Sequence, residues 1–119
     1  MKPAPNPRVG EIWEVNFSPQ VGHEQRGIRP GLVISANHFN DIPHSFRIVV
    51  PLTGTDRGIR SHVQVDPLQG GLTKVSFLLC EQVKALSVER FRDYRGEVTG
   101  ETLRRVRQAV ARYIDARLI

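Results

Sequence analysis

The chain has 119 residues, of which 39% are hydrophobic and 24% charged, so it suits one domain with a buried core and is not a disordered protein. No apolar stretch is long enough to span a membrane, and the single cysteine excludes an intramolecular disulfide, which together predict an intracellular, cytoplasmic protein. The net charge of +5 favours a polyanionic partner, nucleic acid first, although a solubilising surface would show the same excess.

Most of the chain has the pattern of short strands. Residues 1–8 contain three prolines and no hydrophobic stretch, so we expect a flexible arm, followed by one domain over residues 9–119. Residues 11–17 alternate apolar and polar side chains with period two, which predicts a half-buried strand. Further strands are predicted, in chain order, at 30–35, 46–53, 62–66 and 76–86.

Near the end of the chain the apolar residues recur every three or four positions, and no longer every second one. Ser87 is placed to cap a short helix, and Thr99 to cap a longer amphipathic helix that begins near Glu101. The arginine-rich face of the longer helix is interpreted as a solvated surface rather than a second nucleic-acid site. Short strands with a closing helix favour a mostly β fold, a small, strongly curved antiparallel barrel, over a parallel α/β sheet.

The most unusual segment is the polar stretch 22–30, GHEQRGIRP, which is bracketed by glycines and leads directly into a predicted strand. It displays an imidazole, a carboxylate and two guanidinium groups where a loop would be held by rigid strands. Pro30 restricts the backbone of Arg29 to extended conformations. A solvated hairpin loop is the ordinary alternative for such a composition.

Seven segments carry a family resemblance: GEIW at 10–13, FSP at 17–19, VGHEQRGIRP at 21–30, LVIS at 32–35, VPLT at 50–53, GLTKVS at 71–76 and CEQVKAL at 80–86. Together they resemble the MazF/PemK (Kid) toxins of bacterial toxin–antitoxin pairs, over roughly residues 9–118. The resemblance implies an SH3-like barrel, a homodimer and a sequence-specific endoribonuclease of single-stranded RNA that needs no metal or other cofactor. It also implies an antitoxin with an acidic, disordered tail.

Cleavage of RNA without a metal uses the 2′-hydroxyl as nucleophile and leaves a 2′,3′-cyclic phosphate and a 5′-hydroxyl. It requires a base, an acid and a cation that stabilises the charge developing on phosphorus. Arg29 matches the arginine that the MazF branch uses catalytically, and Thr53 matches that branch's catalytic threonine. The resemblance therefore implies that both side chains bind the scissile phosphate.

The PemK branch assigns the roles differently. His23 and Glu81 stand where that branch has a histidine and an aspartate proposed as general base, but Leu79 replaces an arginine proposed as general acid. Residues 79 and 81 should share one face of the predicted strand, so this change removes a cation from the same surface. We expect Arg29 and Thr53 to be the main catalytic residues, with Glu81 and His23 in supporting catalytic roles. The identity of the general base stays open.

Basic and polar side chains elsewhere are expected to bind substrate: Glu24, Arg26, Arg57, Arg60, Lys74 and Ser76. Arg57 and Arg60 flank Gly58 on a loop that could close over RNA and contact its phosphates. For Glu24, a structural pairing with Arg26 or Arg29 is favoured over a catalytic role.

Two other functions fit the same fold, because fold does not fix function. One is a CcdB-like toxin that poisons DNA gyrase by binding it. The other is a barrel that binds nucleic acid without cutting it, an alternative suggested by Leu79.

Overall fold

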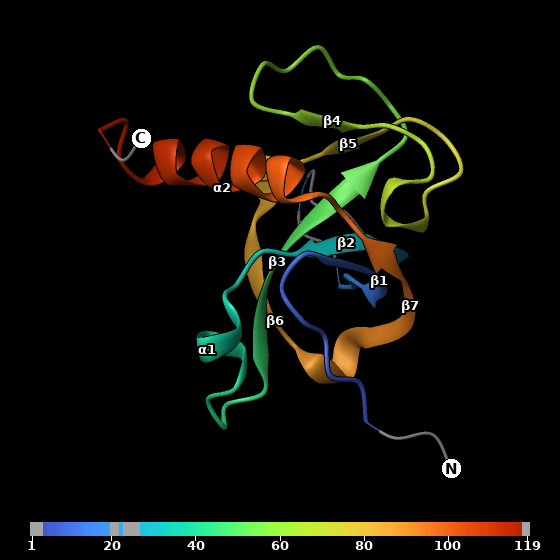
Figure 1. Ribbon diagram of the computed structural model, residues 1–119, viewed down its shortest axis with the longest axis vertical. Coiled ribbons are helices and arrows are strands. Elements are labelled where there is room, and N and C mark those ends of the chain that lie inside the picture. Colours follow the sequence, from blue (N-terminus) through green and yellow to red (C-terminus); the bar gives the residue numbers. More distant parts are fainter. Residues whose placement is uncertain (1–3, 20–21, 23–26, 118–119) are drawn as a thin grey trace.

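The computed structural model describes residues 4–19, 22 and 27–117. Its main feature is one antiparallel sheet that bends strongly (Figure 1). The strands are β1 (Glu11–Asn16), β2 (Ile28–Val33), β3 (Phe46–Thr53), β4 (Val63–Val65), β5 (Ser76–Leu78), β6 (Lys84–Ser87) and β7 (Phe91–Glu97). Their order is β4-β5-β3-β2-β1-β7, with β6 paired to β3, so the described strands leave the sheet open. The predicted mostly β, antiparallel fold is confirmed, and "barrel" describes it only loosely.

The helical segments are short except at the end of the chain. They are α1 (Asn37–Asn40), α2 (Gly100–Ile114) and the 3-10 turns η1 (Gln69–Gly71), η2 (Cys80–Gln82) and η3 (Val88–Arg90). The predicted caps are confirmed: the Thr99 hydroxyl accepts from the backbone N–H of Thr102 at 3.2 Å, and the Ser87 hydroxyl from that of Glu89 at 3.2 Å. No helix in the described part of the chain is long and apolar enough to cross a membrane.

Strand β3 organises the sheet because it pairs with three neighbours in turn. Residues 46–49 pair with β6, residues 49–51 with β2, and residues 52–53 with β5. Its alternation places Val50 and Leu52 in one core cluster, with Val106 and Val110 of α2, and Val49 in a second cluster on the other side. Both faces of the strand are therefore covered, and its two ends are left to carry polar groups.

The single strand predicted over residues 76–86 is wrong. The chain forms β5, turns through η2 and continues as β6, because it pairs first with the end of β3 and then with its beginning. Leu79 is fully buried at the turn and its N–H donates to the carbonyl of Pro51 at 2.9 Å, whereas Glu81 is exposed. Residues 79 and 81 thus do not share a face, and the leucine is a core side chain.

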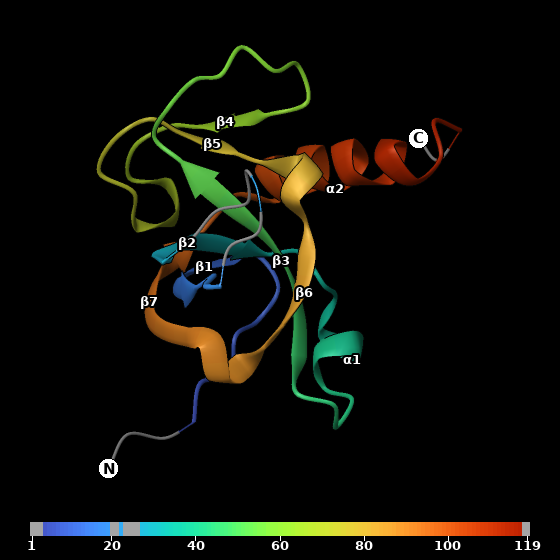
Figure 2. The same ribbon diagram turned by 180° about the vertical axis from the view of Figure 1, so that it is seen from behind.

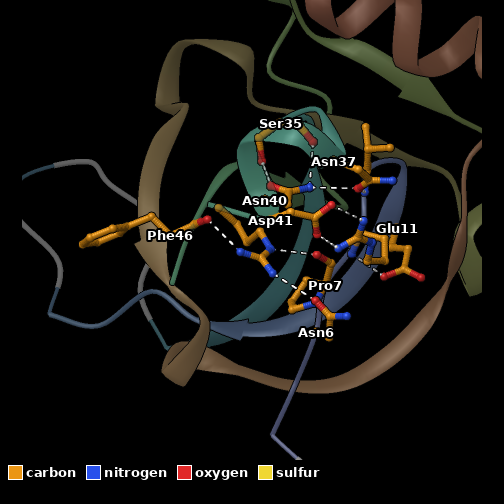
Figure 3. A network of polar contacts seen from close by, with 11 residues as sticks. Asn6, Pro7, Glu11, Ser35, Asn37, Asn40, Asp41 and Phe46 are labelled. Atoms are coloured by element: carbon orange, nitrogen blue, oxygen red, sulfur yellow. Dashed lines mark hydrogen bonds and ion pairs between the residues drawn. The ribbon is translucent and has the colours of Figure 1, made fainter. Parts of the chain in front are cut away.

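A polar network holds the described part of the N-terminal segment to the sheet (Figure 3). Buried Arg47 donates to the Pro7 carbonyl at 2.7 Å and to Asn6 Oδ1 at 3.1 Å. Arg8 forms an ion pair with Asp41 at 2.7 Å, and its guanidinium holds the pKa of that carboxyl below its usual value. These contacts tie residues 6–8 to the domain, and the flexible arm over residues 1–8 stays a prediction.

Candidate active site

A cleft opens where strands β2 and β3 part. The pairing between β2 and β3 ends at Gly31 and Pro51. Arg29 lies two residues before Gly31 on β2, and Thr53 lies two residues after Pro51 on β3, so both lie just beyond this last pair. Pro30 and Pro51 have no N–H to donate, so the two strands lack these ladder donors here. The cleft has a volume of about 590 Å³ and is lined by both Arg29 and Thr53. Strand register thus brings the two leading candidates of the sequence together.

The side chains around this cleft are cationic or hydroxylic. The cations are Arg29, Arg57, Lys74 and Arg95, and the hydroxyls belong to Thr53, Thr55, Thr73 and Ser76. None of the described lining residues is acidic. Guanidinium, ammonium and hydroxyl donors without competing carboxylates suit a phosphate-bearing polyanion.

Three of the four cations have no fixed partner among the residues that the structure describes. Within the described ranges, the side chains of Arg29, Arg57 and Lys74 form no ion pair or hydrogen bond. Arg29 and Arg57 are also exposed. No carboxylate of the described residues pairs with them, so within that part of the chain their charge is available to a ligand.

The hydroxyls differ in how much of their bonding capacity is used. The Thr53 hydroxyl accepts from the N–H of Thr55 at 3.3 Å, which leaves its own hydrogen free to donate. Ser76 is buried and its hydroxyl donates to the Lys74 carbonyl at 3.1 Å, so it holds the segment that carries the ammonium. A Cβ at Gly54 would lie 3.3 Å from Lys74 Cε, which places the lysine stem beside the Thr53–Thr55 turn.

Arg95 of β7 is a cleft cation that sequence reasoning missed. Its guanidinium bonds to the Glu14 carboxylate of β1 and to the Gly71 carbonyl at 3.1 Å. Gly71 has a φ of 70°, and an added Cβ would collide with the carbonyl oxygen of Arg95. The glycine therefore lets the loop that bears Lys74 rest directly on the backbone of β7.

Glu81, expected beside the scissile phosphate, does not line the cleft. Its carboxylate contacts His62 Nε2 at 2.8 and 2.9 Å, and the His62 side chain is only 2% exposed. The pair joins η2 to the end of the β3–β4 loop (residues 54–62), which supports a structural role, while the catalytic role stays a prediction. Burial, together with the Glu81 charge, raises the pKa of the neighbouring Cys80 thiol to about 12, so this buried thiol is neutral.

The other predicted site residues fall into two groups. His23, Glu24 and Arg26 lie outside the described residues. Arg60 lines a different groove, beside α2. Among the residues that the structure describes, no three His, Cys, Asp or Glu side chains gather as a metal site.

Comparison with known proteins identifies the family. Residues 8–114 match the model of the PemK-like, MazF-like toxin of type II toxin-antitoxin systems. The chain belongs to this family. It is 31% identical to the endoribonuclease EndoA of Bacillus subtilis, over 85% of this chain and 88% of that protein, and 31% identical to the endoribonuclease PemK of Escherichia coli, over 92% and 77%. The resemblance seen in the sequence is confirmed.

Solved structures of the same kind share the fold. MazF from Deinococcus radiodurans superposes with a TM-score of 0.79 at 28% identity, covering 91% of this chain and 96% of that one. A mycobacterial endoribonuclease solved in complex with its cognate antitoxin gives a TM-score of 0.74 at 26% identity, over 91% and 94%.

Proposed function

We propose that the chain is an endoribonuclease toxin that cleaves single-stranded RNA in the cleft around Arg29 and Thr53, without a metal ion. The observation that carries this proposal is the meeting of these two residues, from different strands, in one cleft with unpaired cations and no acidic lining among the described residues. Family relatives named as endoribonucleases support the same function.

In this mechanism the scissile phosphate occupies the cleft between β2 and β3. The 2′-oxygen attacks phosphorus and the bond from phosphorus to the 5′-oxygen breaks, giving a 2′,3′-cyclic phosphate and a 5′-hydroxyl. Arg29 and Thr53 donate to the non-bridging oxygens, whose negative charge grows in the transition state. Lys74 and Arg57 bind neighbouring phosphates, which adds affinity without reading sequence.

Proton transfer needs a group of suitable pKa. A guanidinium stays protonated at neutral pH and does not serve as a base. Of the two predicted carriers, Glu81 is engaged by His62 outside the cleft lining, and His23 has an imidazole whose reference pKa of about 6.5 suits transfer at neutral pH. His23 is therefore the proton carrier of this proposal: it takes the proton of the 2′-hydroxyl and passes it to the departing 5′-oxygen. Arg26 and Glu24 of the same segment are substrate contacts.

The same positive cleft suits an acidic antitoxin segment. Charge complementarity favours such a segment over a neutral one, and its occupancy would exclude RNA. A relative solved with its cognate antitoxin supports this partner, and a homodimer is the assembly that the family resemblance implies.

Incubation of the purified protein with single-stranded RNA in EDTA tests the function. We expect cleavage, with 2′,3′-cyclic phosphate and 5′-hydroxyl ends identified by end mapping. The matched control is the same RNA with 2′-O-methyl groups, which lacks the nucleophile and should stay intact. A strict requirement for added metal would contradict the mechanism, and trapped gyrase–DNA complexes without RNA fragments would favour the CcdB-like alternative.

A further inference from the structure

The Lys74 ammonium is carried by the β4–β5 loop (residues 66–75), on an exposed bend between two buried residues. Leu72 precedes the bend and Ser76 follows it, and residues 73–75 between them are exposed. The Ser76 side is fixed by the pairing of β5 with β3 and β4, and by the bond from the Ser76 hydroxyl to the Lys74 carbonyl at 3.1 Å. The contacts on the other side of the bend therefore decide where the ammonium lies in the cleft.

On that other side the loop rests on strand β7. Both ribbon views show η1 beside the end of β7, away from the C-terminal end of α2 (Figures 1 and 2). The start of η1 is held by the Gln69 amide oxygen, which accepts from the N–H of Thr99 at 2.9 Å. Its end is held by main-chain contact, because a Cβ at Gly96 would lie only 2.8 Å from the nitrogen of Gly71. Two glycines have no side chains that interlock, so a directional bond is needed to keep this end of η1 in place.

The Arg95 guanidinium supplies such a bond. One of its terminal nitrogens bonds to the Glu14 carboxylate of β1, and the other donates to the Gly71 carbonyl at 3.1 Å. Glu14 pairs with Pro30 across the β1–β2 ladder, next to the residue that β2 presents to the scissile phosphate. The planar fork of an arginine holds two acceptors in a fixed geometry. Strands β1 and β7 and the β4–β5 loop are thus joined through one side chain.

The Glu14–Arg95 pair also differs in charge from the other cations of the cleft. The two side chains are 22% and 29% exposed, so their attraction is screened less than that of a fully exposed pair. Their charges largely cancel at a distance, so Arg95 adds little to the positive potential of the cleft. An arginine paired in this way is better suited to holding a segment in place than to binding phosphate.

We propose that Arg95, anchored by Glu14, is a positioning residue that fixes the β4–β5 loop so that Lys74 meets the phosphate next to the scissile one. This inference rests on the proposed function and gives one cleft cation a role other than contact with substrate. Without Arg95 the Gly71 carbonyl loses its donor, and the bend with its ammonium is free to move. Binding of RNA then weakens, although no group that touches the RNA has been removed.

A double-mutant cycle between Arg95 and Lys74 tests this assignment. Arg95→Ala, Lys74→Ala and the double variant are compared with the unaltered protein by their Kd for a non-cleavable 2′-O-methyl RNA of mixed sequence, measured by fluorescence anisotropy over a range of salt. Arg92→Ala is the matched control, because Arg92 lies on the same strand and donates to the Glu89 carbonyl at 2.7 Å but is not part of the described cleft lining. Circular dichroism and the thermal midpoint check the fold of every variant.

We expect each single replacement to weaken RNA binding about tenfold and the double replacement to weaken it no further, because Lys74 contributes nothing once its loop is released. The plot of log K against log salt should become shallower by about 0.7 in all three variants, which corresponds to one phosphate contact on a single strand. The kcat for cleavable RNA should stay within about threefold of normal, since Arg29 and Thr53 are unchanged. Arg92→Ala should match the unaltered protein.

Replacement of Glu14 gives a test that depends on the sign of the effect. Glu14→Ala removes a negative charge near the cleft, so electrostatics alone would tighten RNA binding. The positioning role predicts the opposite, a weakening of about threefold to tenfold, because Arg95 loses its anchor. Arg95→Lys keeps the charge without the planar fork and should not restore the affinity.

Three results would overturn the positioning assignment alone. They are additive effects of Arg95→Ala and Lys74→Ala with salt slopes that sum to about 1.4, tighter binding by Glu14→Ala, and full affinity of Arg95→Lys. The first of these would show that Arg95 contacts a phosphate itself. If Arg95→Ala does not fold, Arg95→Lys takes its place in the cycle with the same expectations. If the unaltered protein bound and cleaved no RNA, the proposed function itself would fall, and this inference with it.

Discussion

Strand β3 carries a polar site at each end, and the two sites use the same functional groups in opposite ways. At its start, buried Arg47 is fixed by donation to the Pro7 carbonyl and to Asn6. Beyond its end, in the cleft, exposed Arg29 has no ion pair or side-chain hydrogen bond among the described residues. A guanidinium held by acceptors of the protein stabilises the fold, and one without such acceptors is available to a ligand.

The hydroxyls repeat this contrast. Buried Ser35 donates to Asn40 Oδ1 at 2.6 Å and accepts from the N–H of Ile48 at 3.0 Å, so both its donor and acceptor capacities are used. Thr53 accepts from Thr55 and keeps its hydrogen. The distinction between a structural and a binding group thus lies in the supply of partners, not in residue type.

Replacing the free guanidinium should give the largest effect. We expect Arg29→Ala to lower the RNA cleavage rate by about 10³-fold, because it removes a donor to the transition-state charge. The thermal midpoint should stay unchanged, since the side chain has no partner among the described residues. Full activity would break the comparison, and Arg29→Lys, which keeps charge without the planar fork, measures how much the geometry contributes.

Replacing the fixed guanidinium should have the converse result. Arg47→Ala leaves the Pro7 carbonyl without its donor and opens a gap in a buried site, so we expect a loss of about 2–4 kcal/mol in the free energy of unfolding. Urea denaturation measures this loss. The cleavage rate of the remaining folded protein should be close to normal, and a large selective loss of activity would show that the two ends are coupled.

Glu81→Gln separates a structural from a catalytic carboxylate. The amide keeps the size of the side chain and can still hydrogen-bond to His62, so we expect a stability loss of about 1 kcal/mol or less and a cleavage rate within about threefold of normal. The cleavage rate is measured from RNA samples quenched at successive times. A fall of about 10²-fold or more, without a matching loss of stability, would instead assign Glu81 to proton transfer.

The Arg8–Asp41 pair should give the smallest effect, which shows in how the free energy of unfolding depends on pH. The pKa of Asp41 is lowered from 3.8, first by its hydrogen bond to Arg8, so its contribution to stability is present above pH 3.8 and is lost as the pH falls through the folded-state value. Asp41→Asn should therefore flatten the acid limb of the curve of unfolding free energy against pH. Asp66→Asn, whose carboxylate accepts from the Gln64 amide, is the control. Identical acid limbs for Asp41→Asn and the unaltered protein would contradict this.

Periodicity predicted the parts of the fold that one segment determines. The alternation of residues 11–17 and the three-and-four spacing after Thr99 gave β1 and α2, because each buries one face against the core. Strand β7 was not predicted, since it is mostly exposed and its pairing with β1 shifts register twice. The break at η2 was missed because it depends on which part of β3 each flanking segment meets.

The same limit applies to the site. Arg29 and Thr53 could be named from motifs, and strand register then places them together. Arg95 could not be named, because it reaches the cleft only through β7 and the distant Glu14.

The close approach of Gly71 to the backbone of Arg95 has a consequence for reading mutational data. No side chain separates the two segments, so a larger residue at position 71 would push the loop away and carry Lys74 out of the cleft. A growth-based screen for loss of toxicity would score this glycine alongside residues that touch the substrate. The sensitivity of position 71 to substitution would reflect how closely two main-chain segments approach each other. Inspection of side-chain chemistry overlooks this property.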